Sequence, residues 1–224
     1  MSTAWTVLRK DLRLELRTAE TVPAMVLFAV VTMIIFHFAL NKDTVSGQEA
    51  AGVLVIAILF AAMLGINRLF VAEREQGGFD AFLLAPVERT AMLLAKAAGL
   101  FIFLAVLEVI AVPVFKLFLL GPSLGRPLPG LILVLALTDL ALAVIGTLVS
   151  AIAVHTRARD LIGPLIGLPL LVPALIASAR AAGPLLVAAH APAGPPLRWV
   201  GTLALYDLVF ALLAFAVFDF LLEE

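Results

Sequence analysis

The chain lacks cysteine and has few charged residues. Without cysteine it forms no disulfide, offers no thiol chemistry and cannot hold a haem through thioether bonds. Charged residues make up 14% of the 224 positions, against roughly 25% in soluble domains. The net charge of −1 provides no basic patch for nucleic acid. These absences leave the interior of a membrane as the expected environment.

Apolar residues are abundant instead. They make up 63% of the chain, and its mean hydropathy is +1.16. A soluble fold could not cover that much apolar surface with polar groups. A helix needs about 20 apolar residues to cross the hydrocarbon core. Six stretches meet this length, at residues 21–40, 50–72, 91–117, 130–154, 161–180 and 200–222. The sequence therefore predicts an all-α membrane protein with six transmembrane helices.

The linkers between these stretches are short and hold most of the charge, so we expect a single transmembrane domain over residues 1–224. Residues 1–20 lack the apolar core of a signal peptide. If the N-terminus lies in the cytoplasm, ten Lys and Arg residues fall on the cytoplasmic side and five on the other. The positive-inside rule then predicts that both termini lie in the cytoplasm. We expect a multi-pass protein of the bacterial inner membrane.

The first 20 residues have the pattern of an amphipathic helix. One face is apolar and a second face is basic, which is typical of a helix lying in the membrane interface with its cations toward lipid phosphates. This elbow helix either braces the first span or only anchors the topology. The apolar positions are Trp5, Leu8, Leu12 and Leu16, and the basic ones are Arg9, Lys10, Arg13 and Arg17.

The loop between the second and third spans, residues 70–89, carries the most information. Gly77-Gly78 ends the preceding helix, and a short apolar helix over residues 79–85 is stopped by Pro86. So short a helix is unstable alone, and apolar anchors at this spacing usually lie in a groove on a partner. We expect a cytoplasmic coupling helix gripped by a motor subunit; the alternative is a helix resting on lipid headgroups. The coupling residues are Glu73, Arg74, Glu75, Gly77, Phe79, Asp80, Phe82, Leu83, Leu84 and Pro86.

These residues resemble a known family. Glu73-Arg-Glu-Gln-Gly77, followed by Leu83-Leu84 and Pro86-Val87, is similar to the first cytoplasmic loop of ABC-2-type exporter membrane subunits. The opening segment, residues 8–17, and the first span, residues 28–36, look like those of the CcmB family, the haem exporter protein B of bacterial cytochrome c maturation. Residues 76–80 depart from it, reading Gln-Gly-Gly-Phe-Asp where members often have Asp-Gly-Ser-Leu-Glu.

The resemblance implies a non-catalytic permease subunit that has no ATP site of its own. It implies a CcmA-like ATPase, two copies of each subunit, CcmC-like and CcmD-like membrane subunits, and indirectly a CcmE-like haem chaperone. Haem would be handled by partner subunits, so we expect no cofactor here. Consistently, the chain has no glycine-rich Lys-Ser/Thr phosphate loop. The alternatives are a generic ABC-2 exporter for another hydrophobic or lipid-linked substrate, an intramembrane enzyme, or a channel.

Three carboxyl side chains, those of Glu108, Asp139 and Asp207, fall within predicted spans. Such groups are costly in a bilayer and usually face a protein interior or a water path. We expect an intramembrane polar cluster, with Lys116 and Arg180 as possible partners. The cluster either changes shape during the ATP cycle or is a static, satisfied network that holds the helices together.

The three histidines give no sign of a catalytic or metal site. His37, His155 and His190 share no local spacing that would clamp one iron. They also do not converge with acidic residues as an intramembrane enzyme would require. We expect no catalytic residue and no metal ligand.

The fifth span carries Pro164, Pro169 and Pro173. Each removes a backbone donor and clashes with the preceding turn, which predicts a bent helix. Residues 181–196 are apolar but broken by Gly and Pro. They predict a pair of short re-entrant helices; the alternative is a loose loop.

Overall fold

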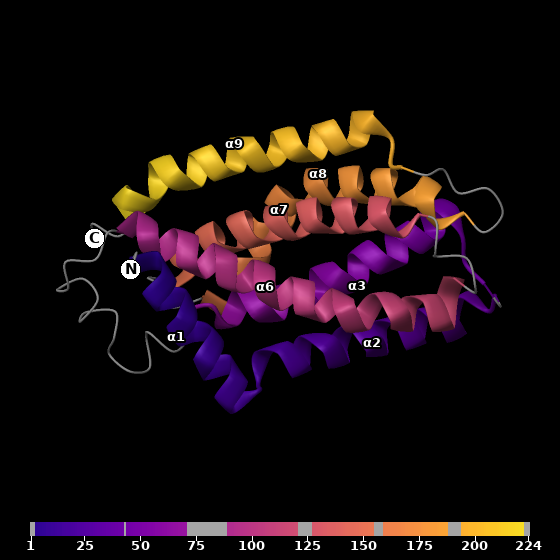
Figure 1. The fold of residues 1–224 in the computed structure, drawn as a ribbon, viewed down its shortest axis with the longest axis horizontal. Helices are drawn as coiled ribbons and strands as arrows, with labels where there is room; N and C mark the ends of the chain where they lie inside the picture. Colours follow the sequence, from indigo (N-terminus) through magenta and orange to yellow (C-terminus); the bar gives the residue numbers. More distant parts are fainter. Residues whose placement is uncertain are drawn as a thin grey trace.

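The structure is a computed structural model that describes residues 3–42, 44–70, 89–120, 127–154, 159–187 and 194–221. Throughout these ranges the regular elements are helices (Figure 1). They are α1 (Thr3–Thr18), α2 (Thr21–Leu40), α3 (Gly47–Arg68), α6 (Arg89–Phe115), the π-helix η1 (Lys116–Leu120), α7 (Leu128–Val154), α8 (Arg159–Ala182), the 3₁₀-helix η2 (Gly183–Leu186) and α9 (Leu197–Leu221).

Six of the helices are long and apolar enough to cross a membrane, with mean hydropathies of 1.8 to 2.5 in their most apolar windows. Helices satisfy their own backbone groups, which is why they can cross lipid. The prediction of a helical fold with six candidate spans is confirmed. The first predicted span and α2 share the same bounds, 21–40, whereas α3 begins at Gly47 and ends at Arg68.

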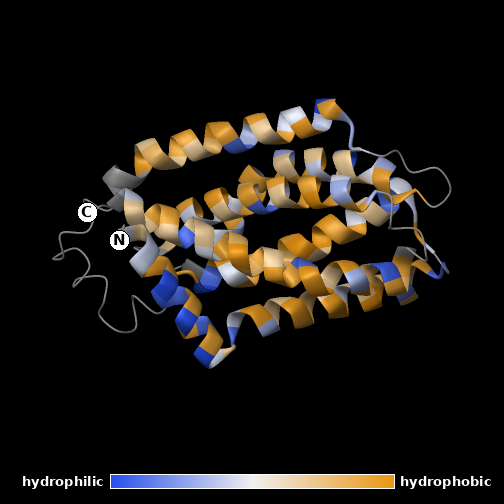
Figure 2. Ribbon diagram, viewed as in Figure 1, coloured by the Kyte–Doolittle hydropathy of each residue, from blue (hydrophilic) through white to orange (hydrophobic). Residues whose placement is uncertain are grey.

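The spanning helices run side by side along the long axis, and α1 crosses them at one end (Figure 1). Hydrophilic residues gather on α1 and near the two ends of the bundle, with apolar ribbon between them (Figure 2). We call the two ends the α1 end and the opposite end. In α3, 72% of the most apolar window is buried, against 17% in α2 and in α9. Helix α3 is therefore central, and α2 and α9 are peripheral.

Small residues let α3 and α7 approach closely at the centre. A Cβ atom added at Gly146 of α7 would lie 2.6 Å from Cγ1 of Ile66 in α3. Four residues on, Ser150 Oγ donates a hydrogen bond of 3.0 Å to the backbone oxygen of the same Ile66. Between α7 and α8, the hydroxyls of Thr138 and Ser178 lie 2.6 Å apart. Such close backbones and hydroxyl contacts are typical of helix packing in membranes.

The proline-rich fifth span is the continuous helix α8, with Pro164, Pro169 and Pro173 inside it. Tyr206 of α9 donates its hydroxyl to the carbonyl of Leu170, in the segment between two of these prolines. A neighbouring helix thus binds backbone oxygen near the prolines, as lipid-embedded helices require.

The segment after α8 contains the single 3₁₀ turn η2, whose Leu185 and Leu186 are buried. It packs on α3, where the space beside Gly183 is filled by Gln48. In the described part of residues 181–196 the structure has the end of α8 and this one turn, so the predicted pair of short re-entrant helices stays a prediction. Residues 188–193 lie outside the described residues.

Candidate functional site

The predicted coupling residues, Glu73 to Pro86, lie outside the described residues, as do His155 and His190. The structure describes what flanks the coupling segment. Phe70 precedes it and α6 begins after it at Arg89, both at the α1 end of the bundle (Figure 1). The described residues at this end are those nearest in sequence to the predicted coupling segment.

Helix α1 is amphipathic, and part of its apolar face packs on the bundle. Val7 is buried, and Leu8 lies 3.7 Å from a Cβ atom placed on Gly99 of α6. Trp5 and Leu16 are 49% and 83% exposed. The predicted apolar stripe is therefore divided between α6 and the surroundings. The basic positions Arg9, Lys10, Arg13 and Arg17 are exposed.

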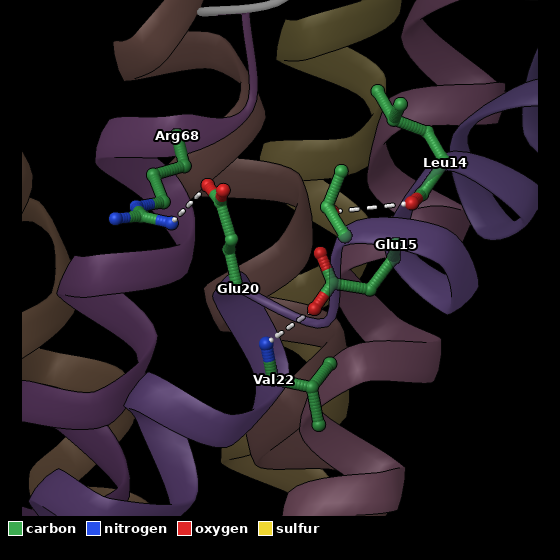
Figure 3. Close-up of polar contacts among 6 residues, drawn as sticks. Leu14, Glu15, Glu20, Val22 and Arg68 are labelled. Carbon is green, nitrogen blue, oxygen red and sulfur yellow. Dashed lines mark hydrogen bonds and ion pairs between the residues drawn. The ribbon is translucent and has the colours of Figure 1, made fainter.

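Two carboxylates fix the turn from α1 into α2 (Figure 3). Glu15 Oε1 accepts a hydrogen bond of 2.7 Å from the backbone N–H of Val22, one of the donors that a helix start leaves unpaired. Glu20 Oε2 lies 3.4 Å from Nη1 of Arg68, at the end of α3. Between the two helices, Ala19 adopts a left-handed backbone with φ of 48°. The sharp change of direction is thus held by side chains on both sides of it.

A buried ion pair joins α1 to α6. Lys96 of α6 is only 3% exposed, and its Nζ lies 2.9 Å from Oδ2 of Asp11. The same Nζ lies 5.4 Å from the ring centre of Phe70, and Lys10 approaches Asp11 at 3.3 Å. In the sequence, Lys96 is one of the ten Lys and Arg residues assigned to the cytoplasmic side, and no pattern distinguishes Asp11. The available signal was a lysine placed seven residues inside a spanning helix.

In the middle of the bundle, the carboxyl groups of Glu108 on α6 and Asp139 on α7 are brought close enough to interact. Glu108 Oε1 and Asp139 Oδ1 are buried without a hydrogen-bond partner, and both oxygens of the buried Asp207 on α9 lack one as well. The expected cations do not compensate them, because Lys116 and Arg180 are exposed.

His37 lies near the C-terminus of α2, at the opposite end of the bundle from α1, between two aromatic rings. Its ring centre is 5.2 Å from that of Phe38 and 5.9 Å from that of Phe118 in η1, both edge-on. In the described ranges, no three His, Cys, Asp or Glu side chains gather closely enough to hold a metal ion. The arrangement around His37 is therefore an aromatic contact between α2 and η1.

Comparisons with known proteins agree on one family. The family model described as CcmB protein matches residues 2–219. Three similar proteins, each named heme exporter protein B, come from Rhodobacter capsulatus, Pseudomonas aeruginosa and Bradyrhizobium diazoefficiens. The first is 29% identical over 78% of this chain and 79% of its own length. The second is 30% identical over 71% of each chain. The third is 26% identical over 91% of this chain and 90% of its own length. A match that runs from one end of the chain almost to the other shows that the chain belongs to the CcmB protein family.

Proposed function

We propose that this protein is the membrane-spanning subunit of an ABC transporter for haem export or haem-chaperone release in c-type cytochrome biogenesis. The observation that carries the proposal is the family match over residues 2–219, together with relatives named heme exporter protein B. The six candidate spans fit a membrane subunit. The chain has no phosphate-binding loop, so ATP would be hydrolysed by a partner.

The α1 end of the bundle would face the cytoplasm. Ten of the 15 Lys and Arg residues in the sequence belong to this end or to the loops beside it, which the positive-inside rule assigns to the cytoplasm. Helix α1, with its basic face exposed and Trp5 and Leu16 free to enter lipid, fits an elbow helix in the membrane interface. Both termini then lie in the cytoplasm.

The coupling segment, residues 71–88, would meet a CcmA-like ATPase at this end. Two copies of each are proposed, because a pair of ATPase subunits needs two coupling segments. CcmC-like and CcmD-like subunits, and indirectly a CcmE-like chaperone, complete the assembly that the family resemblance implies. Haem and ATP would bind those partners.

We also propose that the mid-bundle carboxyls change their interactions during the transport cycle. A static network would leave its polar atoms satisfied. Here the buried oxygens of Glu108, Asp139 and Asp207 include four without a partner. Carboxyl groups inside a membrane whose oxygens lack hydrogen-bond donors are typical of sites that exchange protons or binding partners.

The proposal is tested by affinity purification from membranes of a host that carries the neighbouring genes. The unmodified chain should bring down an ATPase, and Phe79→Asp or Phe82→Asp should lose it. Leu197→Asp is the matched control, because Leu197 is 86% exposed at the opposite end of the bundle. Purification of the unmodified chain without any ATPase would contradict the transporter assignment.

Deletion of the gene tests the cargo. It should remove haem-stained c-type cytochromes from the membranes, and the intact gene should restore them. If deletion leaves c-type cytochromes at their normal level, the chain serves another hydrophobic or lipid-linked substrate.

A further inference from the structure

The residues that flank positions 71–88 on either side come together around the side chain of Lys96. Phe70, the residue before this segment, is 2% exposed and packs with Met92 and Leu93 of α6. Lys96, two turns into the same helix, places its ammonium 5.4 Å from the centre of the Phe70 ring. An ammonium at this distance from an aromatic face is attracted to it, most strongly when water is excluded. Entry and exit of the segment are therefore joined at Lys96.

The same lysine joins α1 to this point. Asp11 lies 2.9 Å from Lys96 Nζ, and one turn away Leu8 lies against Gly99. The two helices run antiparallel where they touch, because Leu8 pairs with Gly99 and Asp11 pairs with Lys96. They are in contact over about one turn. An ion pair and an apolar contact together fix the register of α1 on α6.

Helix α1 continues this connection into the rest of the bundle. Glu15 accepts a hydrogen bond from the backbone N–H of Val22 in the first turn of α2, and Glu20 reaches Arg68 at the end of α3 (Figure 3). The carboxylates of Asp11, Glu15 and Glu20 thus contact three different helices. Helix α1 and the turn that follows it therefore contact both helices that flank residues 71–88, α3 and α6.

We propose that Asp11, Lys96 and Phe70 form a junction that makes α1 move as one unit with the end of α3 and the start of α6, the two elements that flank residues 71–88. The junction carries movement imposed on the segment into α1 and the bundle. Lys96 is its positioning residue. The role in ATP coupling rests on the proposed function above; the rigid attachment of α1 to α6 does not.

The burial of the charge supports this role. Lys96 is 4% exposed along its side chain and Asp11 14%, whereas the pair Lys42–Glu49 at the opposite end is 51% and 60% exposed. Burying an ion pair gives little stability compared with apolar residues of the same size, but it fixes one geometry. A buried pair beside an aromatic face suits a joint that must keep its alignment under load.

Substitution of Lys96 tests the junction. Lys96→Met removes the charge and keeps the length, and it should lower haem-stained c-type cytochromes at least tenfold per unit of membrane-inserted protein. The ATPase should still co-purify at the unmodified level. Lys96→Arg keeps the charge and should stay within about threefold. Lys42→Met, in the exposed pair, is the matched control and should have no effect. Full activity of Lys96→Met would overturn the proposal.

A disulfide tests the rigid unit independently of whether Lys96→Met inserts. The chain has no cysteine, so Leu8→Cys with Gly99→Cys introduces the sole pair. Because thiols on the cytoplasmic side are kept reduced, a membrane-permeant thiol oxidant is added to form this lock. The lock should leave c-type cytochrome formation at the level of the equally treated unmodified chain, with or without later reductant, and should form in lower yield when Lys96→Met is added. If the locked protein is inactive and recovers on reduction, α1 separates from α6 during transport and the proposal is wrong.

The two proposals fail separately. If no ATPase co-purifies with the unmodified chain, the proposed function fails, while the yield of the disulfide with and without Lys96→Met still decides whether Lys96 holds α1 against α6. If the ATPase is present and the lock blocks activity, only the junction is wrong.

Discussion

Buried charges at the α1 end and buried carboxyls in the middle of the bundle are treated in opposite ways. At the α1 end, Asp11 finds Lys96 at 2.9 Å, and Glu15 finds a backbone donor at 2.7 Å. In the middle, Asp207 is 3% exposed, which is more deeply buried than Asp11, and it has no hydrogen-bond partner on either oxygen. A satisfied pair fixes geometry, whereas an unsatisfied one is costly and is retained where it serves a changing state. In the proposals above, the α1 end therefore keeps one geometry, whereas the carboxyls in the middle of the bundle change their interactions.

Neutralising the mid-bundle pair should have the largest effect on activity. Glu108→Gln and Asp139→Asn keep shape and hydrogen bonding but cannot gain or lose a proton. Each should abolish c-type cytochrome formation, measured by haem staining, with protein levels unchanged by immunoblot. Thr138→Val, beside Asp139 on α7, is the control and should retain activity. Normal staining in both amide variants would show that the pair is only structural.

Breaking the satisfied pair should have the largest effect on stability. Asp11→Asn removes the carboxylate charge that lies 2.9 Å from the buried Nζ of Lys96, and loss of one partner of a buried pair costs up to roughly 3–5 kcal/mol. The melting temperature in detergent should fall by several degrees. Glu49→Gln breaks an exposed pair, which is worth about 0–1 kcal/mol, so its melting temperature should hardly move. Equal shifts in the two variants would remove the contrast between buried and exposed pairs.

Removing an unsatisfied carboxyl should stabilise the protein. Asp207→Leu exchanges two buried, unpartnered oxygens for methyl groups, and unpaired buried polar groups cost about 1–3 kcal/mol on mutational scales. The melting temperature should therefore rise while cytochrome formation falls. A drop in stability would mean that Asp207 has a compensating partner in the assembled complex.

The smallest effect is expected from removing a hydrogen bond between a neutral side chain and the backbone. Tyr206→Phe removes the hydroxyl that binds the carbonyl of Leu170 in α8, and a single neutral hydrogen bond contributes about 1 kcal/mol. The melting temperature should fall slightly with activity intact. Leu205→Ala, next to it and 62% exposed, is a control for changes at this level of α9.

The spans could be predicted because the bilayer imposes length and polarity on them. The first span is bounded by Glu20 and by Asn41-Lys42, so hydropathy alone gives its bounds. Which helix meets which could not be predicted. Asp11 and Lys96 are 85 positions apart in the sequence, and an amphipathic pattern tells which face of a helix is apolar without naming its neighbour.

The mid-bundle cluster shows the same limit. Its three carboxyls were predicted from their cost in lipid, but the pairing of Glu108 with Asp139 depends on helix packing. The suggested cation Lys116 is exposed and is the first residue of the π-helix η1, three residues after Pro113, which lies inside α6. A π turn adds residues to each turn and changes the direction in which a side chain points. Hydropathy gives no warning of such a turn.

The close fit of α3 against α7 has a consequence for how the protein is made. Ser150 binds the backbone of Ile66 from 84 residues further along the chain. During synthesis α3 would therefore enter the membrane well before α7, and Ile66 would face lipid until α7 is inserted. The core closes late, so nascent chains stalled before α7 would be natural targets for membrane quality control. Substitutions that enlarge Gly146 should lower the yield of inserted protein before they alter transport.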